Sequence, residues 1–164
     1  MKQASVLILD DEVIMRDFLE ETLKRKLLNV ECTAEPYTAL KKLKEKFYEI
    51  FITDLKLPYL NGLEVLKKSK EISPYTEVVL ITAYGTVESA VEAMKLGAFD
   101  YINKPFKPEE IELIVDTIIK RFAEEKEEKE EKEEEKKEET VKFPEIVTNS
   151  KQMIDVLKLI SRVA

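Results

Sequence analysis

Short apolar runs alternate with amphipathic stretches along the first three quarters of the chain. The apolar runs predict strands at about 5–10, 29–33, 50–54, 77–82 and 99–102. Between and after them, apolar residues recur every three or four positions, which predicts helices at about 12–27, 36–47, 62–72, 87–96 and 108–123. Strands and helices that alternate in this order predict an α/β domain built on a parallel sheet.

Breaker residues support several of these boundaries. Pro36 and Pro108 suit the first position of a helix, where the missing N–H would have no partner in any case. Gly97 is typical of the residue that follows the end of a helix. The runs 6–9 and 78–81 are apolar at every position, so we expect helices to cover both faces of the sheet.

A run of only lysine and glutamate follows this domain, at 124–139. A solvated linker is the simpler interpretation of such a run. Helix is the alternative, because several glutamates precede a lysine by four residues, as in Glu125 and Lys129. The sequence therefore predicts a domain over 1–123 and a linker over 124–142, and leaves open whether the fifth helix extends into that linker.

The remaining residues, 143–164, have a different character. Ser150 is a good N-cap for a short helix with one apolar face, and the chain stops at Ala164 before that helix ends. We interpret this segment as the truncated start of a second domain.

Composition excludes several kinds of chemistry. The chain has one cysteine and no histidine, so a Ser-His-Asp or Cys-His device, a zinc site of His and Cys ligands, and an intrachain disulfide are all excluded. The net charge of −7 includes no basic cluster typical of nucleic-acid binding. With no signal peptide and no run approaching the roughly 20 residues of a membrane span, a cytoplasmic location is expected. The charged fraction of 37% and only three glycines suggest a thermophilic source.

Polar residues stand at or just beyond the ends of the predicted strands. They are Asp10, Asp11, Asp54, Thr82 and Lys104. The carboxyl ends of parallel strands meet at one edge of the sheet, where such folds bind ligands. Three carboxylates in one pocket repel each other unless a cation lies between them, and carboxylate oxygens are the ligands that Mg²⁺ prefers. Together with a hydroxyl and an ammonium group, this set suits phosphoryl transfer.

The segments that carry these residues match a known family. LILDDE at 7–12, TDLKLPYLNGLE at 53–64, LITAYG at 80–85 and YINKPF at 101–106 resemble the receiver domains of bacterial two-component response regulators. The resemblance covers about residues 4–122 and is specific through the combination of the four motifs. It implies a flavodoxin-like, doubly wound sheet of five parallel strands in the order 2-1-3-4-5, with five helices.

The resemblance implies a role for each acidic residue. Asp54 is the expected phosphoacceptor. Asp11 and Asp54 are expected to ligate Mg²⁺ together with the backbone carbonyl of Lys56, and Asp10 is expected to act partly through water.

The same resemblance implies how the site reports phosphorylation. Thr82 and Lys104 are expected to contact the phosphoryl group. Tyr101 is the expected switch residue, which moves inward as Thr82 moves towards the phosphate. The peptide bond between Lys104 and Pro105 is expected to be cis.

A narrower likeness concerns the output. Residues 81–106 look most like receivers of the nitrogen-regulation type, the sigma-54-dependent activators, and 146–164 resemble the entry to their AAA+ ATPase domain. No glycine follows Gly97, so a phosphate-binding loop is absent and the fragment is not expected to be an enzyme. The ATPase, the contact with sigma-54 RNA polymerase, and any DNA binding are expected in a missing C-terminal part.

An apolar stripe on the fifth helix suggests a homodimer. Wide stripes usually pack in the core, but this one is broad enough to serve both the sheet and a second chain. The residues expected at the dimer face are Ile111, Val115, Ile118 and Phe122.

The leading functional hypothesis is a switch that accepts a phosphoryl group from a separate sensor histidine kinase. A phosphatase with an aspartyl nucleophile is one alternative, although no second acid follows Asp54 closely. A receiver-like scaffold that is never phosphorylated is the other, and the complete set of acids with Lys104 argues against it.

Overall fold

The structure is a computed structural model that describes residues 3–147, with side chains as far as residue 131. The strands are β1 (Ser5–Leu9), β2 (Asn29–Thr33), β3 (Ile50–Thr53), β4 (Glu77–Thr82) and β5 (Asp100–Asn103). The helices are α1 (Val13–Lys24), α2 (Pro36–Glu45), α3 (Gly62–Ile72), α4 (Val87–Lys95) and α5 (Pro108–Val147).

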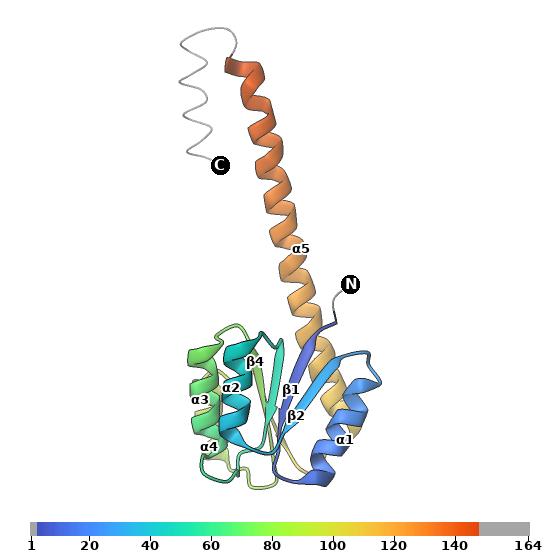
Figure 1. Cartoon of the computed structure of the whole chain (residues 1–164), viewed down its shortest axis with the longest axis vertical. Coiled ribbons are helices and arrows are strands. Elements are labelled where there is room, and N and C mark those ends of the chain that lie inside the picture. Colours follow the sequence, from blue (N-terminus) through green and yellow to red (C-terminus); the bar gives the residue numbers. More distant parts are fainter. Residues whose placement is uncertain (1–2, 148–164) are drawn as a thin grey trace. The chain divides into compact units, whose positions relative to one another are not determined.

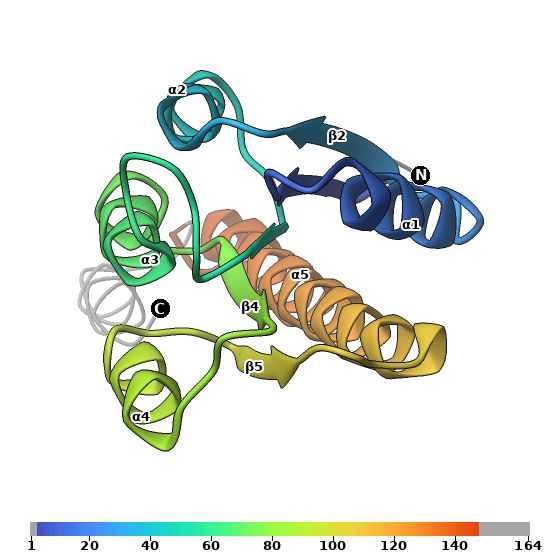
Figure 2. The ribbon, with the colours of Figure 1, turned by 90° about the horizontal axis from the view of Figure 1, so that it is seen from below.

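All five strands are parallel and lie in the order β2-β1-β3-β4-β5, which confirms the predicted topology. Figure 2 shows α2, α3 and α4 along one side of the sheet, and α1 with the first part of α5 along the other. The strand order reverses at β1 and β3, and ligands bind next to such a switch point in doubly wound folds.

Alternation along the strands divides the core between the two faces. Leu7 and Leu9 pack in the cluster shared with α2 and α3, whereas Val6 and Ile8 are buried outside that cluster. Every residue of β1 and β3 is buried, as expected for central strands covered by helices on both sides.

Helix α1 ends at Lys24, three residues before the predicted end. The chain turns through Leu27, whose φ of 61° lies in the left-handed region that glycine usually supplies after a helix. A leucine at this position carries no sequence signal for the end of a helix, so the apolar pattern alone overestimated its length.

Helix α5 continues through the charged run to Val147, so the helical alternative for that run is confirmed. Figure 1 shows that it is the longest of the described helices. Glutamates that precede lysines by four residues, such as Glu125 and Lys129, stabilise this charged part of the helix, which has no apolar face of its own.

The expected dimer face on α5 requires a correction. Ile111, Val115 and Ile118 each have no exposed surface, because α5 packs them into the core of their own chain. These three side chains cannot contact a second chain in this arrangement. Phe122 is partly exposed, and Leu113 is the exposed large apolar residue of this segment.

Contacts divide the chain into two compact units, residues 1–120 and 121–164. The first contains the whole sheet. The short helix expected from Ser150 lies outside the described residues. Among residues 3–147, no helix combines the length and the apolar character needed to cross a membrane.

Candidate functional site

Asp10 and Asp54 are brought together by the register of the two central strands. Leu9 pairs with Thr53, so the next residues, Asp10 and Asp54, stand side by side where the strands end. The amide N–H of Asp54 donates to the carbonyl oxygen of Leu9 at 3.1 Å, which continues the ladder by one bond. Both residues are 3% exposed, although a carboxylate is costly to bury without a partner.

The ammonium group of Lys104 is that partner. Lys104 Nζ lies 3.1 Å from Asp10 Oδ2 and 2.9 Å from Asp54 Oδ2, so one cation joins two buried acids. Lys104 follows β5, and its amide N–H donates to the carbonyl oxygen of Thr82 at 2.8 Å, which fixes the backbone at this point.

Burial and pairing have opposite effects on the ionisation of these groups. Burial raises the pKa of Asp10 above its ordinary value, although the Glu12 N–H and the Lys104 ammonium act in the other direction. Burial lowers the pKa of Lys104, but the hydrogen bonds and charges of Asp54 and Asp10 together raise it above its ordinary value. Lys104 therefore stays charged at neutral pH, as an electrostatic partner for oxyanions must.

Four contacts hold Asp10 in position. Its Oδ1 accepts from the Glu12 N–H at 2.9 Å and its Oδ2 from Lys104. Its backbone carbonyl accepts from the Arg16 guanidinium at 2.8 Å, and its N–H donates to the carbonyl of Thr33 at 3.2 Å. Arg16 was not predicted as a site residue, because nothing in its spacing predicts a bond to a backbone carbonyl six residues earlier.

Three carboxylates could share a metal ion. Within the described part of the chain, Asp10, Glu12 and Asp54 each offer an oxygen, and these oxygens all lie within 4.8 Å of one another. Asp11 is exposed and is not in that group. An all-oxygen carboxylate set fits Mg²⁺. Glu12 was predicted only as the start of a helix, and the run of three acids at 10–12 is the sequence signal for its place in this group.

The β3–α3 loop supports Asp54 from the other side. Asp54 Oδ1 accepts from the Lys56 N–H at 3.2 Å, and the Gly62 N–H donates to the Leu55 carbonyl at 2.6 Å. The Lys56 ammonium lies 4.3 Å from the centroid of the Tyr84 ring, so a cation–π contact joins this loop to the β4–α4 loop.

Replacing Gly62 by alanine is expected to lower the free energy of unfolding by about 1–3 kcal/mol, the usual cost of overpacking. A Cβ at Gly62 would lie 2.3 Å from the Asp54 carbonyl oxygen and 2.5 Å from Leu55 Cα, and both are backbone atoms that cannot move aside alone. Urea unfolding measures the loss. Gly85→Ala is the matched comparison, because the atoms nearest to its Cβ belong to side chains. A Gly62→Ala protein as stable as the parent would contradict this account.

Thr82 and Tyr101 lie beyond the acids, towards the edge strand β5. Thr82 is fully buried, and its Oγ1 accepts from the Tyr84 N–H at 3.0 Å. Tyr101 is partly buried, and its hydroxyl lies 2.7 Å from Ser89 Oγ. The Lys104–Pro105 peptide bond is cis, as the resemblance implied.

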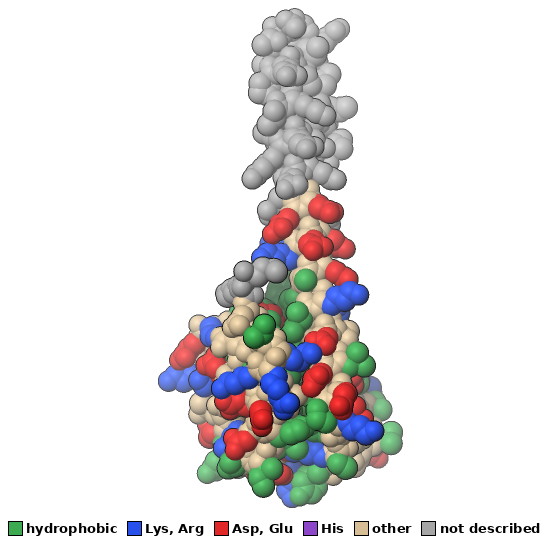
Figure 3. Space-filling view, turned by 90° about the vertical axis from the view of Figure 1, so that its right-hand side faces the viewer, with side chains coloured by type: hydrophobic (Ala, Val, Ile, Leu, Met, Phe, Trp, Pro, Cys, Tyr) green, Lys and Arg blue, Asp and Glu red, His purple; other side chains and the backbone are tan. Residues whose placement is uncertain are grey.

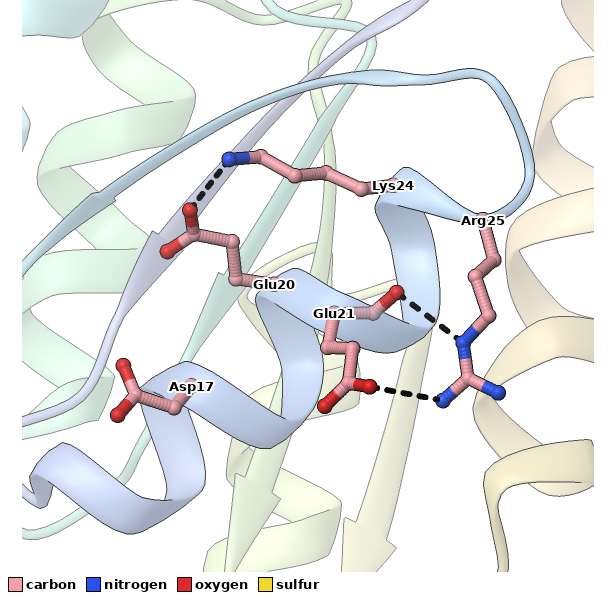
Figure 4. Close-up of a pocket in the computed structure, with 5 residues that line it drawn as sticks. All are labelled: Asp17, Glu20, Glu21, Lys24 and Arg25. Atoms are coloured by element: carbon pink, nitrogen blue, oxygen red, sulfur yellow. Dashed lines mark hydrogen bonds and ion pairs between the residues drawn. The ribbon is translucent and has the colours of Figure 1, made fainter.

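A separate pocket on α1 contains none of these site residues. Figure 4 shows its lining, Asp17, Glu20, Glu21, Lys24 and Arg25, with Glu20 paired to Lys24 and Glu21 paired to Arg25. Both pairs join residues four apart on an exposed helix surface and contribute little to stability. The pocket therefore has the character of an ordinary charged surface.

Comparison with known proteins identifies the class of this chain. The family model described as the response regulator receiver domain matches residues 6–116, and the chain belongs to that family. Its fold and its cluster of acids with one lysine agree with the expectation from the four motifs.

The relatives include regulators of the nitrogen-regulation type. Regulatory protein AtoC of Escherichia coli is 31% identical over 97% of this chain and 34% of its own length. The DNA-binding transcriptional regulator NtrC of Proteus hauseri is 30% identical over 77% of this chain and 27% of its own length. These relatives confirm the narrower resemblance. The chain spans about a third or less of the length of the curated relatives that it matches.

Solved receiver structures have the same fold. A CheY-like receiver domain protein from Methanospirillum hungatei has a TM-score of 0.71 at 28% identity and covers 75% of this chain and 99% of its own. A receiver domain protein from Clostridium thermocellum has a TM-score of 0.69 at 29% identity and covers 73% of this chain and 97% of its own.

Proposed function

We propose that Asp54 is the phosphoacceptor of this receiver and that a sensor histidine kinase is the donor. The single observation that carries this proposal is the position of Lys104, whose ammonium bridges the buried Asp54 and Asp10 carboxylates. An Asp54 oxygen attacks phosphorus, the bond from phosphorus to the donor nitrogen breaks, and the nitrogen leaves with the electron pair. These 164 residues contain no histidine, so the donor histidine lies outside them.

Mg²⁺ is the proposed cofactor. When bound, it supplies positive charge that offsets the charge on the phosphoryl oxygens. Asp10, Asp11, Asp54 and the backbone carbonyl of Lys56 are the proposed ligands. The grouping of Asp10 and Asp54 supports the site.

Thr82 and Lys104 are the proposed contacts of the transferred group. Lys104 already contacts the Asp54 carboxylate, and the Thr82 hydroxyl can donate to a phosphoryl oxygen. A phosphoryl group adds a charge of about −1.5 to −2. The Lys104 ammonium would then contact the phosphoryl oxygens in place of part of its present contact with the two carboxylates.

Tyr101 is the proposed switch residue, which turns inward when Thr82 moves towards the phosphoryl group. The surface made by α4, β5 and α5 would then rearrange and change self-association. Exposed apolar side chains on this surface support the idea: Val87, Val91, Met94 and Leu113.

Apolar side chains near the site would suit a protein donor. Val13 and Ile14 follow the acidic loop and are 57% and 85% exposed, and Tyr59 in the β3–α3 loop is 84% exposed. Figure 3 shows hydrophobic side chains at the lower end of the first unit, the end at which the strands finish in Figure 1. Such residues are typical of protein contact surfaces.

In the full-length protein, this receiver would control a sigma-54-dependent AAA+ ATPase, as the relatedness to NtrC suggests. It is thus a regulatory module and not a turnover enzyme, and DNA binding would belong to a further domain. Residues 1–120 would form the receiver and the following charged helix would connect it to the ATPase.

Sedimentation tests the output step. With Mg²⁺, beryllofluoride mimics a phosphoryl group on an aspartate, and we expect it to change the self-association of the chain. The Asp54→Ala protein, which cannot hold the mimic, is the control and should show no change. An unchanged monomer with and without the mimic would contradict the dimer proposal while leaving phosphoryl transfer to its own test.

A further inference from the structure

The hydroxyl group of Tyr101 is bound to the first turn of α4. It lies 2.7 Å from Ser89 Oγ, and the contact is formed across twelve residues of sequence. Tyr101 is the predicted switch residue, but no partner for its hydroxyl was predicted from the sequence. Ser89 gives it one, and the bond joins β5 to the beginning of the neighbouring helix.

Ser89 is also part of the N-terminal cap of α4. The Ser89 N–H donates to Thr86 Oγ1 at 3.0 Å, and the Thr86 N–H donates to Ser89 Oγ at 2.9 Å. These two bonds form a capping box, which satisfies N–H groups that the helix itself cannot pair. One serine oxygen therefore serves the helix cap and the switch tyrosine together.

Ser89 Oγ is shared by three groups of Thr86 and by the Tyr101 hydroxyl. It donates to the Thr86 carbonyl at 3.0 Å, and the Thr86 N–H at 2.9 Å and the Thr86 hydroxyl at 3.1 Å both donate to it. A serine hydroxyl has one proton and two acceptor sites, so the Tyr101 proton competes with the Thr86 hydroxyl for the second site. The contact with Tyr101, at 2.7 Å, is the shorter of these two, and loss of the Tyr101 hydroxyl removes it.

Gly85 makes room for the contact. A Cβ at this position would lie 2.7 Å from the Tyr101 hydroxyl and 2.4 Å from Asn103 Oδ1. The β4–α4 loop therefore passes directly against the tyrosine, and a side chain at this position would have to displace Tyr101 or Asn103. The position of Tyr101 and the path of this loop depend on each other.

The same loop reaches the phosphoacceptor site through Thr82. Thr82 Oγ1 accepts from the Tyr84 N–H at 3.0 Å, so the start of the loop is tied to a proposed phosphoryl contact and its end is tied to Ser89 and Tyr101. A phosphoryl group that draws the Thr82 hydroxyl away weakens the hydrogen bond between Thr82 Oγ1 and the Tyr84 N–H.

We propose that the Ser89–Tyr101 hydrogen bond restrains the first turn of α4 and is the contact through which movement of Tyr101 reaches that helix. The event that moves Tyr101 rests on the proposed function, whereas the restraint itself exists without a phosphoryl group. Release of the bond loosens the turn that carries Val87, which is 82% exposed and begins the apolar surface of α4.

Amide hydrogen exchange in the first turn of α4, measured on the whole 164-residue chain, tests the restraint. Tyr101→Phe keeps the ring and the capping box and removes only the shared bond. Exchange in this turn is expected to rise about two- to tenfold, the range that the net contribution of one hydrogen bond allows. Tyr75→Phe, at a residue that is 79% exposed, is the matched control and should leave exchange unchanged.

The double variant decides whether the two hydroxyls act together. Ser89→Ala should raise exchange more than Tyr101→Phe, because it removes the capping box as well. Adding Tyr101→Phe to Ser89→Ala should then have no further effect, since the bond is already lost. Additive effects, or a Tyr101→Phe protein with unchanged exchange, would overturn the proposal.

Beryllofluoride with Mg²⁺ separates this inference from the proposed function. Fluorine NMR reports whether the mimic binds, and Asp54→Ala should prevent binding. In the parent chain, binding should raise exchange in this turn to the level of Tyr101→Phe, and no rise would overturn transmission through Ser89. Failure of the mimic to bind would count against the proposed function. Hydrogen exchange of the parent and of Tyr101→Phe without the mimic would still show whether the Ser89–Tyr101 bond restrains this turn.

Discussion

The Asp54→Ala protein is expected to gain no phosphoryl group when treated with acetyl phosphate and Mg²⁺, whereas the parent chain gains one. Asp54 is buried beside Lys104 and Asp10, and alanine leaves no oxygen at this position to attack phosphorus. Intact-protein mass spectrometry measures the added group directly. The expected effect is complete loss, because a nucleophile is removed and not merely repositioned.

Two controls separate this effect from unfolding. Asp17→Asn changes an exposed acid on α1 and should be labelled like the parent. The Asp54→Ala protein should be at least as stable as the parent, because it has lost one of several carboxylates that repel each other. The assignment of Asp54 as phosphoacceptor would be contradicted if the Asp54→Ala protein were labelled to the level of the parent. Absence of labelling in a folded parent with Mg²⁺ present would contradict it too.

Replacing Lys104 by methionine is expected to lower the free energy of unfolding by about 3 kcal/mol at neutral pH without Mg²⁺, because removing one partner of a buried ion pair leaves an uncompensated charge. Here two carboxylates, with 4% and 3% of their side-chain surface exposed, would lose their shared cation. Urea unfolding measures the change.

The dependence on pH and on metal identifies the cause of this loss. Burial already raises the pKa of Asp10, and we expect this pKa to rise further without Lys104. Lower pH therefore neutralises the Asp10 carboxyl group in the folded variant. The difference in free energy of unfolding between the variant and the parent should then become smaller. Mg²⁺ should also make this difference in free energy of unfolding smaller, because it binds the folded state. Lys67→Met, at an exposed lysine on α3, is the control. A Lys104→Met protein as stable as its parent would show that the acids need no resident cation.

The sequence predicted most of the fold because its signals are local and agree with each other. Apolar runs gave the strands to within one residue, and the helix that begins at Gly62 was predicted at both ends. The end of α1 was missed because Leu27 adopts a backbone conformation that carries no compositional signal. The charged continuation of α5 was left open because solvated helix and solvated linker share the same composition.

The site was predictable where it depends on strand ends and less so where it depends on loops. Strand order and register alone bring Asp10 beside Asp54, so these two could be found from the pattern. The positions of Glu12, Arg16 and Ser89 depend on backbone turns that no spacing rule specifies. The burial of three residues expected at the dimer face was not predictable for a different reason. A wide apolar stripe does not reveal how much of it the sheet already covers, and here it covers Ile111, Val115 and Ile118.

The two outer strands of the sheet restrict how copies of this chain can assemble. At one edge of the sheet, Glu31 of β2 pairs with Lys42 and Lys46 and accepts from the hydroxyl of Tyr48, so the edge strand carries a charged residue. At the other border, β5 is only four residues long and gives way to a proline two positions later. Edge strands that are short or charged disfavour edge-to-edge pairing of sheets from two copies. Wherever copies of this chain associate, such edges favour contacts through helices over strand pairing, and helix packing can be adjusted without breaking backbone hydrogen bonds of the sheet.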